Sequence, residues 1–445
     1  MKHEWGADPS LHSEREFGYE QPMPIGNNFQ HADYSRADPG ERASYREVEA
    51  AAPPDSPAWQ DEMARLGAQL AAAGVRAVLF VHGVAPGTDP FGAQRLDEVG
   101  GLRRGYSRGI AGLDALLALM RQETNGLPQL PGSLNPPFKD DDQTRKLLDE
   151  QIGDACSFTT AYVDRFKEAV NRNVSRQIAC LRLLWSSEHH HLGRSQAAWR
   201  LLLRLRGVCE ELKLGPDDRL LVQAHGQAGL VLALASNLLA QEASSGRKRF
   251  FQILTGFSER SGAGPETIAQ LTGLAEQLAD GRLLSGATLD VVTFGTPIRY
   301  GWDTSGVGRL LHVVNHRVMR TDGKRWLAKT ELPQITMEMP IAWGGDYVQQ
   351  LAVAASDAAT PKEPGAQAAN KDLWELLEPY DGFERWLECA RRSVRCANDG
   401  LCLLADYKDA GSPNVREHLY GHAAYTRLAN LLFNTTQIVR TLYAS

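Results

Sequence analysis

The chain of 445 residues is 43% hydrophobic and 23% charged, the composition of a globular protein with a sizeable core. Its formal net charge of −6 excludes the basic footprint of a nucleic-acid-binding protein. The sequence has no run of about 18 apolar residues, so we expect no transmembrane segment. Six cysteines without a CxxC pair or metal-ligand spacing indicate reduced, mostly buried thiols, no metal and no organic cofactor.

The N-terminal segment, residues 1–56, is polar and contains prolines without a sustained hydrophobic period. We expect an N-terminal arm or leader, partly disordered, ahead of a single domain over 57–445. The segment contains no apolar stretch of the kind that a signal peptide needs. The sequence therefore predicts a cytoplasmic protein, or one exported without a signal peptide.

Strand-like and helix-like segments alternate through the rest of the chain. Short apolar runs indicate strands at 75–83, 178–187, 219–224, 286–297, 309–317 and 400–407, and 249–254 is also strand-like. Helical spacing of apolar residues marks 57–74, 191–212, 230–243 and 416–433. This alternation predicts an α/β fold with a mainly parallel sheet and helices on both faces.

One long insertion separates the first two strands. Residues 103–180 are mostly helical and exceed the length that a compact crossover needs. We expect this insertion near 103–180 to form a helical cap over the sheet.

The stretch Ala224-His225-Gly226-Gln227-Ala228-Gly229 has the form of a nucleophile elbow without its nucleophile. In such an elbow a strand turns sharply into a helix, and small residues flank the nucleophile because the backbone is crowded. Here the strand, the helix and the small neighbours are present, but glycine stands where serine is usual.

Four segments occur in the order found in bacterial lipase/esterase-like α/β hydrolases, which this chain resembles over about residues 75–435. They are LFVHG (79–83), LLVQAHGQAG (220–229), VVTFGTP (291–297) and LYGHAAYTR (419–427). The segment 183–202 is similar to a strand–helix unit in a large-insert branch of that superfamily, which includes phospholipase effectors of type VI secretion. The resemblance implies an α/β-hydrolase fold and a serine hydrolase of the lipase/esterase type with a Ser–His–Asp catalytic triad.

The resemblance assigns Gly226 to the nucleophile position and His422 to the general base, with His418 as an alternative. It assigns the oxyanion hole to the backbone N–H of Gln227 together with that of Gly83 or Val84.

The chain order requires the acid between positions 226 and 422. We select Asp346 over Asp357 and Asp303, because two glycines free the backbone before it and a helix is expected to follow. Each of the three could instead cap a helix without any catalytic role.

Two other motifs are expected to carry no chemistry. The run His189-His190-His191 cannot chelate together on one helix, so it indicates the polar mouth of the cleft or plain surface. Ser258 follows the strand-like 249–254 but precedes Arg260 where an elbow needs a small residue, which predicts a loop.

We therefore predict a carboxylic-ester hydrolase that is inactive in this chain, or an active-site variant of one, because position 226 is glycine. Its partner would be a small-molecule or lipid ester, with a protein partner in addition if it is a secreted effector. The alternative is a natural pseudoenzyme that binds an ester or a toxin partner.

Overall fold

The computed structural model describes residue 29 and the ranges 43–48, 52–83, 140–151, 153–154, 156–188, 190–240, 245–316, 345–346, 348–349, 361, 363–377, 397, 399–408 and 421–444. The description of the fold and the site concerns these residues.

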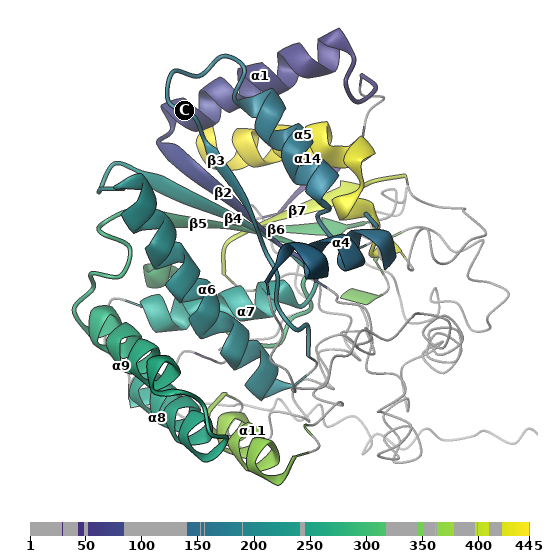
Figure 1. Ribbon diagram of the computed structural model, residues 1–445. Coiled ribbons are helices and arrows are strands. Elements are labelled where there is room, and N and C mark those ends of the chain that lie inside the picture. Colours follow the sequence, from purple (N-terminus) through teal and green to yellow (C-terminus); the bar gives the residue numbers. More distant parts are fainter. Residues whose placement is uncertain are drawn as a thin grey trace, which may run out of the picture.

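A seven-stranded, all-parallel sheet lies at the centre of the molecule (Figure 1). Its spatial order is β1-β7-β6-β5-β4-β2-β3. The strands are β1 (Ala43–Glu47), β2 (Val75–Val81), β3 (Ala179–Leu183), β4 (Arg219–His225), β5 (Thr288–Phe294), β6 (Arg309–Asn315) and β7 (Leu401–Asp406). Strands β2, β4, β5 and β6 are buried almost throughout, as expected for parallel strands covered on both faces. The α/β class and the parallel sheet predicted from the sequence are confirmed.

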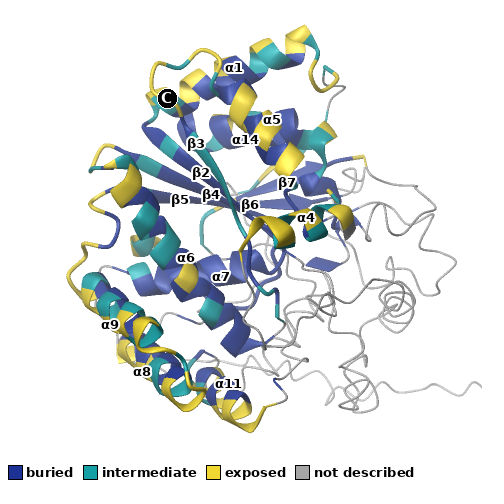
Figure 2. Ribbon diagram, in the orientation of Figure 1, coloured by how far each residue is buried: buried dark blue, intermediate teal, exposed yellow. Residues whose placement is uncertain are grey.

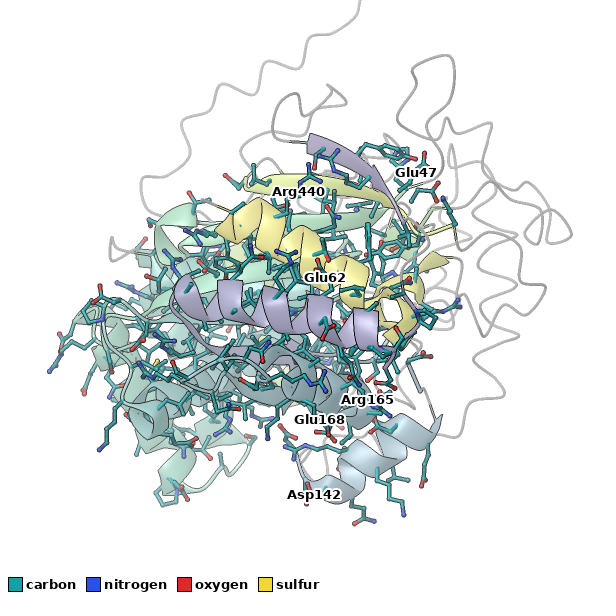
Figure 3. The ribbon with its side chains drawn as sticks, turned by 90° about the horizontal axis from the view of Figure 1, so that it is seen from above. Glu47, Glu62, Asp142, Arg165, Glu168 and Arg440 are labelled. Carbon is teal, nitrogen blue, oxygen red and sulfur yellow. The ribbon has the colours of Figure 1, made fainter. Side chains whose placement is uncertain are left out.

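Helices cover both faces of the sheet (Figure 1). One face is covered by α1 (Pro57–Ala72), α5 (Thr160–Val170) and α14 (Leu431–Ile438), followed by the π-helical turn η10 (Val439–Tyr443). Figure 3 looks down on this layer and shows α1 lying beside α14. Beneath it, the Phe80 ring packs edge to face on Phe166 and at a tilt on Phe158. Such aromatic contacts and the buried apolar area hold α5 against β2.

The other face is covered first by α6 (His191–Leu212) and α7 (Ala228–Leu239). An outer layer of α8 (Ser245–Arg260), α9 (Pro265–Ala279) and α11 (Pro364–Leu377) packs on these two (Figure 1). Helix α7 is buried along nearly its whole length, whereas α8, α9 and α11 expose their outer sides (Figure 2). A helix that is apolar all round belongs in such an interior position.

The N-terminal segment contributes to the fold, unlike the arm expected from the sequence. Residues Ala43–Glu47 form the edge strand β1, which pairs in parallel with β7. The Phe29 side chain is buried, its ring stacks on Phe250, and its carbonyl oxygen accepts from the Gly301 N–H at 2.8 Å. These contacts could not be predicted from the sequence, because the segment is polar, and an edge strand and a single buried aromatic residue produce little hydrophobic periodicity.

The C-terminal part of the segment predicted to form the cap belongs to the core instead. Residues 156–180 belong to the core, because Phe158 and α5 pack beneath the sheet and β3 begins at Ala179. Helix α4 (Asp142–Gln151) also falls within 103–180, and residues 103–139 lie outside the described residues.

Two further predictions were wrong. Residues 249–254 are helical and lie in α8, as does Ser258, which is buried. A short apolar run fits a strand and a buried helix equally well, and here the helix packs against α9 and α11. Cys402 is disulfide-bonded, whereas Cys156, Cys180 and Cys209 are free, so the expectation of reduced thiols fails at Cys402.

Among the described helices, none combines the length and the apolar character that a membrane crossing requires.

Candidate active site

The turn after β4 is built around Gly226. Its φ of +54° lies in the left-handed region, where a non-glycine residue is strained by about 1–3 kcal/mol. The Gly226 N–H donates to the Phe294 carbonyl oxygen at 2.8 Å, and the Thr296 hydroxyl donates to the Gly226 carbonyl oxygen at 2.8 Å. Helix α7 starts two residues later at Ala228. The end of β5 thus holds the sharp strand-to-helix turn in place.

His422 and Asp346 meet beside this turn. His422 Nδ1 lies 2.8 Å from Asp346 Oδ2, and both side chains are buried. The carboxylate accepts a second hydrogen bond, from the Tyr425 hydroxyl at 2.8 Å. A carboxylate that accepts from Nδ1 sets the imidazole tautomer and directs its Nε2 lone pair away from the acid.

The segments that carry these residues approach each other because both contain glycine. A Cβ on Gly421 would lie 1.8 Å from the Gly345 carbonyl oxygen, so only glycine permits this backbone contact. Asn315, at the end of β6, donates from Nδ2 to the Gly421 carbonyl oxygen and accepts the Asp346 N–H at its own carbonyl. The ends of β6 and β7 therefore bring the predicted acid and the predicted histidine together.

The imidazole of His422 faces the turn. An ideal Cβ on Gly226 would lie 2.9 Å from His422 Nε2 and 3.7 Å from the Gly83 Cα. A serine whose hydroxyl donates to a histidine holds the Cβ and the nitrogen roughly 3.5 Å apart, so serine here would displace the ring by roughly half an ångström. The structure brings Gly226, His422 and Asp346 into one cluster.

The backbone groups assigned to the oxyanion hole differ in their surroundings. Gln227 is the N-cap residue of α7, next to the positive end of that helix, and its side chain donates to the Ser187 carbonyl oxygen at 2.7 Å. The Gly83 N–H donates to the Cys156 carbonyl oxygen at 3.3 Å. Val84 lies outside the described residues. Of the two alternatives for the second donor, the Gly83 N–H is thus already hydrogen-bonded.

His82 joins two strand ends. Its Nε2 accepts from the Trp185 backbone N–H at 3.0 Å, and its carbonyl oxygen accepts from the Trp185 indole N–H at 2.8 Å. These two bonds attach the end of β2 to the segment after β3. The side chain has a structural role here, in agreement with its complete burial.

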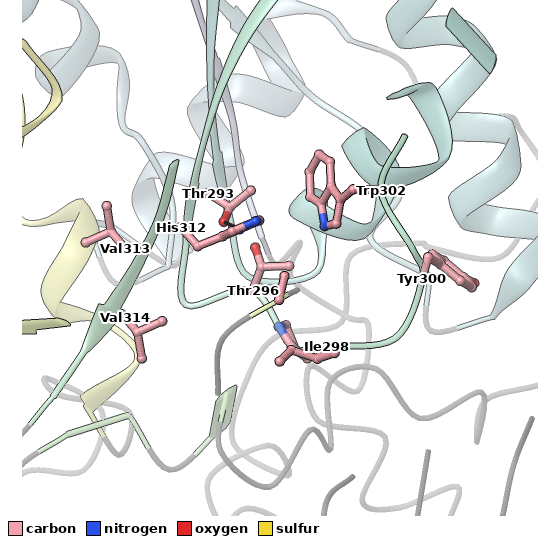
Figure 4. A pocket seen from close by; sticks show the side chains of 10 residues that line it. Thr293, Thr296, Ile298, Tyr300, Trp302, His312, Val313 and Val314 are labelled. Atoms are coloured by element: carbon pink, nitrogen blue, oxygen red, sulfur yellow. Dashed lines mark hydrogen bonds between the residues drawn. The ribbon is translucent and has the colours of Figure 1, made fainter. Parts of the chain in front are cut away.

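A small pocket adjoins the turn on the far side of Thr296 (Figure 4). Thr293 Oγ1 and His312 Nδ1 are 2.7 Å apart within it, and the Trp302 ring stands edge-on to His312. The remaining lining residues are Pro297, Ile298, Tyr300, Val313, Val314 and Ala397. Because Thr296 contacts both the pocket and the Gly226 carbonyl, the two are neighbours in space.

The other candidate residues occupy different places. Asp303 caps the short helix η3 (Thr304–Gly306), accepting from the Ser305 N–H at 3.0 Å. Asp357 and His418 lie outside the described residues, as does His189.

His190 and His191 are buried, which contradicts the prediction of a surface or a cleft mouth. His190 Nδ1 caps α6 through the Gly193 N–H, and His191 Nδ1 lies 2.6 Å from the Tyr300 hydroxyl. Polar rings can be buried at this helix start because each has a hydrogen-bond partner.

Sequence reasoning missed several residues of the site. Three of them position the site: Tyr425 holds Asp346, Asn315 holds the loop that carries His422, and Thr296 holds the Gly226 turn. Two more, Cys156 and His225, lie close to His422. The position of Tyr425 three residues after His422 was visible in the sequence, but the pairing with Asp346 depends on the fold.

Protein families, curated proteins and solved structures were compared with the chain, and no match was found in any of the three.

Proposed function

We propose that this protein is an α/β hydrolase of the lipase/esterase type whose site binds carboxylic esters, lipid esters among them. The proposal rests on the line from Asp346 Oδ2 through His422 to the Gly226 turn. Asp346 Oδ2 lies 2.8 Å from His422 Nδ1, and a Cβ added to Gly226 would lie 2.9 Å from His422 Nε2. Position 226, Asp346 and His422 also follow one another in the chain order of such hydrolases.

The residues present support the acid–base part of ester hydrolysis. In this mechanism His422 Nε2 accepts a proton from the attacking group, and Asp346 stabilises the imidazolium that results. The N–H of Gln227, at the start of α7, and that of Val84 are the proposed donors to the carbonyl oxygen. Asp346 is in turn held by the Tyr425 hydroxyl.

Gly226 has no hydroxyl, so this chain forms no acyl-enzyme at position 226. Triad enzymes that lose a member keep roughly 10³-fold catalysis over water. We therefore expect the natural protein to bind esters and to hydrolyse them very slowly.

A second candidate, a non-catalytic binding protein, is favoured by Gly226 itself. The His422 ring lies closer to the turn than a serine would allow, as it could in a protein that never carries out acyl transfer. In this case the same cleft binds an ester or a protein partner.

The decisive test is Gly226→Ser, with Gly226→Ala as the matched control that adds a Cβ but no hydroxyl. Short and long p-nitrophenyl esters, a phospholipid and a fluorophosphonate label would be used. Removing a triad nucleophile costs about 10⁶-fold in a working enzyme, so the serine variant should gain activity by orders of magnitude. The alanine variant and Gly226→Ser/His422→Ala should stay at the level of the natural protein.

If a folded Gly226→Ser protein neither hydrolyses any of these esters nor reacts with the label, the hydrolase proposal fails. Direct binding of a non-hydrolysable ester analogue to the natural chain would then decide between an ester-binding protein and a protein-binding one.

The disulfide at Cys402 bears on where the protein acts. Disulfides persist in oxidising compartments and are rare in the cytosol. Of the two localisations predicted, we therefore favour export. Alkylation in denaturant without reductant, followed by mass spectrometry, should label Cys156, Cys180 and Cys209 but leave Cys402 unlabelled. Labelling of Cys402 in protein from the native host would contradict export to an oxidising compartment.

A further inference from the structure

Three metal-ligating side chains converge beside the Gly226 turn. One ligand atom from each of Cys156, His225 and His422 lies within 4.8 Å of the other two, and all three residues are buried. They come from three distant parts of the chain: the segment before α5, the end of β4 and the loop after β7. A thiolate with two imidazoles is a set that Zn²⁺ binds, with a fourth position left for another ligand.

His422 has the outer contacts of a metal-binding histidine. Its Nδ1 lies 2.8 Å from Asp346 Oδ2, and Asp346 also accepts from Tyr425. A carboxylate on one ring nitrogen orients the ring and leaves the other nitrogen with a lone pair for a metal. The same arrangement suits a general base, so it is compatible with a metal site but does not by itself indicate one.

His225 supplies an observation that general-base chemistry does not explain. Its Nε2 lies 2.9 Å from the His422 carbonyl oxygen, an acceptor, so Nε2 carries the proton and Nδ1 the lone pair. Nδ1 is buried and makes no hydrogen bond. A buried polar atom left unpaired costs about 1–3 kcal/mol. A metal ion bound at Nδ1 would remove this cost.

Gly83 keeps space open beside His225, because a Cβ at position 83 would lie 2.5 Å from His225 Nδ1.

Cys156 is held in a costly conformation. Its φ of +67° is in the left-handed region, at about 1–3 kcal/mol for a residue with a side chain. Its Sγ lies 3.9 Å from the His422 carbonyl oxygen, on the same side of His422 as His225 Nε2. Strained backbone of this kind gathers at ligand sites, where the surrounding structure enforces it.

We propose that Cys156, His225 and His422 bind one Zn²⁺ ion. Bond lengths of about 2.3 Å to sulfur and 2.0–2.1 Å to nitrogen place tetrahedral ligands roughly 3.3–3.7 Å apart, so the cluster closes by about 1 Å on binding. Binding releases the thiol proton of Cys156 to solvent and forms the Zn–S bond without any change of oxidation state. The sequence analysis expected no metal, because the three ligands are 69 or more positions apart in the chain.

The metal site shares His422 with the proposed hydrolase, so metal binding is tested on the chain as it stands, in which position 226 is glycine and no ester hydrolysis is required. Protein would be produced in medium supplemented with Zn²⁺ or Co²⁺, so that metal is present while the buried site folds. Elemental analysis should find one ion per chain. The Co²⁺ form should show the near-ultraviolet thiolate-to-cobalt charge-transfer band together with tetrahedral d–d bands.

Cys156→Ser and His225→Gln should each lose the ion, and Cys156→Ser should also abolish the charge-transfer band. Cys209→Ser is the matched control, because Cys209 is a second buried free cysteine and lies in α6 outside the cluster. Asp346→Asn should weaken Zn²⁺ binding about 10- to 100-fold without removing a ligand. Circular dichroism of every variant separates loss of metal from loss of fold.

Natural protein without the ion, or a folded Cys156→Ser variant that keeps the ion and the band, would overturn the metal site. Neither outcome affects the esterase proposal, since that rests on the Gly226→Ser variant. Failure of Gly226→Ser to hydrolyse esters would in turn leave the metal measurements unchanged.

Discussion

At the scale of single residues, Tyr425 connects the acid of the site to the sheet. Its hydroxyl donates to Asp346 Oδ2 at 2.8 Å and accepts from the Asn315 N–H at 2.7 Å. Its ring also packs edge to face with His422. One side chain thus positions the carboxylate, the strand end and the imidazole together.

Tyr425→Phe should therefore lower activity as well as stability. The substitution leaves the Asn315 N–H and the carboxylate each without one partner, which costs about 1–3 kcal/mol of unfolding free energy. In a Gly226→Ser background it should also reduce kcat, because Asp346 is less firmly held. Urea unfolding and ester hydrolysis measure the two effects.

Tyr407→Phe is the matched control. The Tyr407 hydroxyl is also buried and donates to Asn434 Oδ1 at 2.6 Å, but it does not contact Asp346 or His422 in the described structure. It should lose comparable stability and keep its kcat. Equal kcat for the two phenylalanine variants would show that Tyr425 does not position the acid.

At the scale of elements, the site depends on the loops that leave β6 and β7. Gly421 has φ of +84° and Gly345 has φ of +93°, and their backbones touch. No side chain fits between them, so the contact holds His422 and Asp346 in register.

Gly421→Ala should disrupt this contact. The new Cβ would meet the Gly345 carbonyl oxygen at 1.8 Å, so the loops must separate. Gly262→Ala is the control, because Gly262 has a similar φ of +73° and open space around its Cβ position. The control should lose about 1 kcal/mol through backbone strain alone.

Gly421→Ala should lose more stability than Gly262→Ala in urea unfolding, and in a Gly226→Ser background it alone should lose esterase activity. Equal losses of stability in the two variants would mean that the loop contact contributes nothing.

At the scale of the whole molecule, the N-terminal segment closes the fold on two sides. Strand β1 covers the edge of β7, and Phe29 packs on Phe250 of α8 beside Gly301.

Phe29→Ala should destabilise the protein by about 3–5 kcal/mol, the usual effect of emptying a buried phenylalanine site. Differential scanning calorimetry would show it as a fall in Tm. An unchanged Tm would mean that Phe29 does not anchor the N-terminal segment to α8.

The N-terminal ends of three neighbouring strands are held by one carboxylate. Asp218 accepts from Arg76 at 2.8 Å, from Arg176 at 3.3 Å and from the Gly215 N–H at 3.1 Å. Burial acts to raise the pKa of Asp218, but the Gly215 N–H and the two guanidinium groups outweigh it and lower the pKa below its ordinary value.

Because the folded pKa is lowered, the contribution of Asp218 is complete above the ordinary aspartate pKa and is lost as pH falls through the folded value. Asp218→Asn should therefore destabilise the protein at neutral pH, by about 1–3 kcal/mol, and progressively less on acidification. Urea titrations across this pH range measure the difference. Asp217→Asn, at the exposed neighbouring position, is the control and should leave the free energy of unfolding at neutral pH nearly unchanged.

The sequence by itself determined the elements and their class. Runs of apolar residues located the strands β2 to β7, and helical spacing located α1, α6 and α7, because buried faces impose these periods on the chain. The selection of Gly226, Asp346 and His422 came from the resemblance to α/β hydrolases and from the chain order that it implies, and the structure brings these residues together.

Only the tertiary structure decided which distant residues meet. Four features depend on contacts between distant positions of the chain. They are the pairing of β1 with β7, the burial of Phe29, the helical state of 249–254, and the cluster of Cys156 and His225 beside His422. Local periodicity reports which face of an element is buried but not what covers it. The covering partners are fixed by packing, where close backbone approaches such as Gly421 against Gly345 decide what comes within bonding distance.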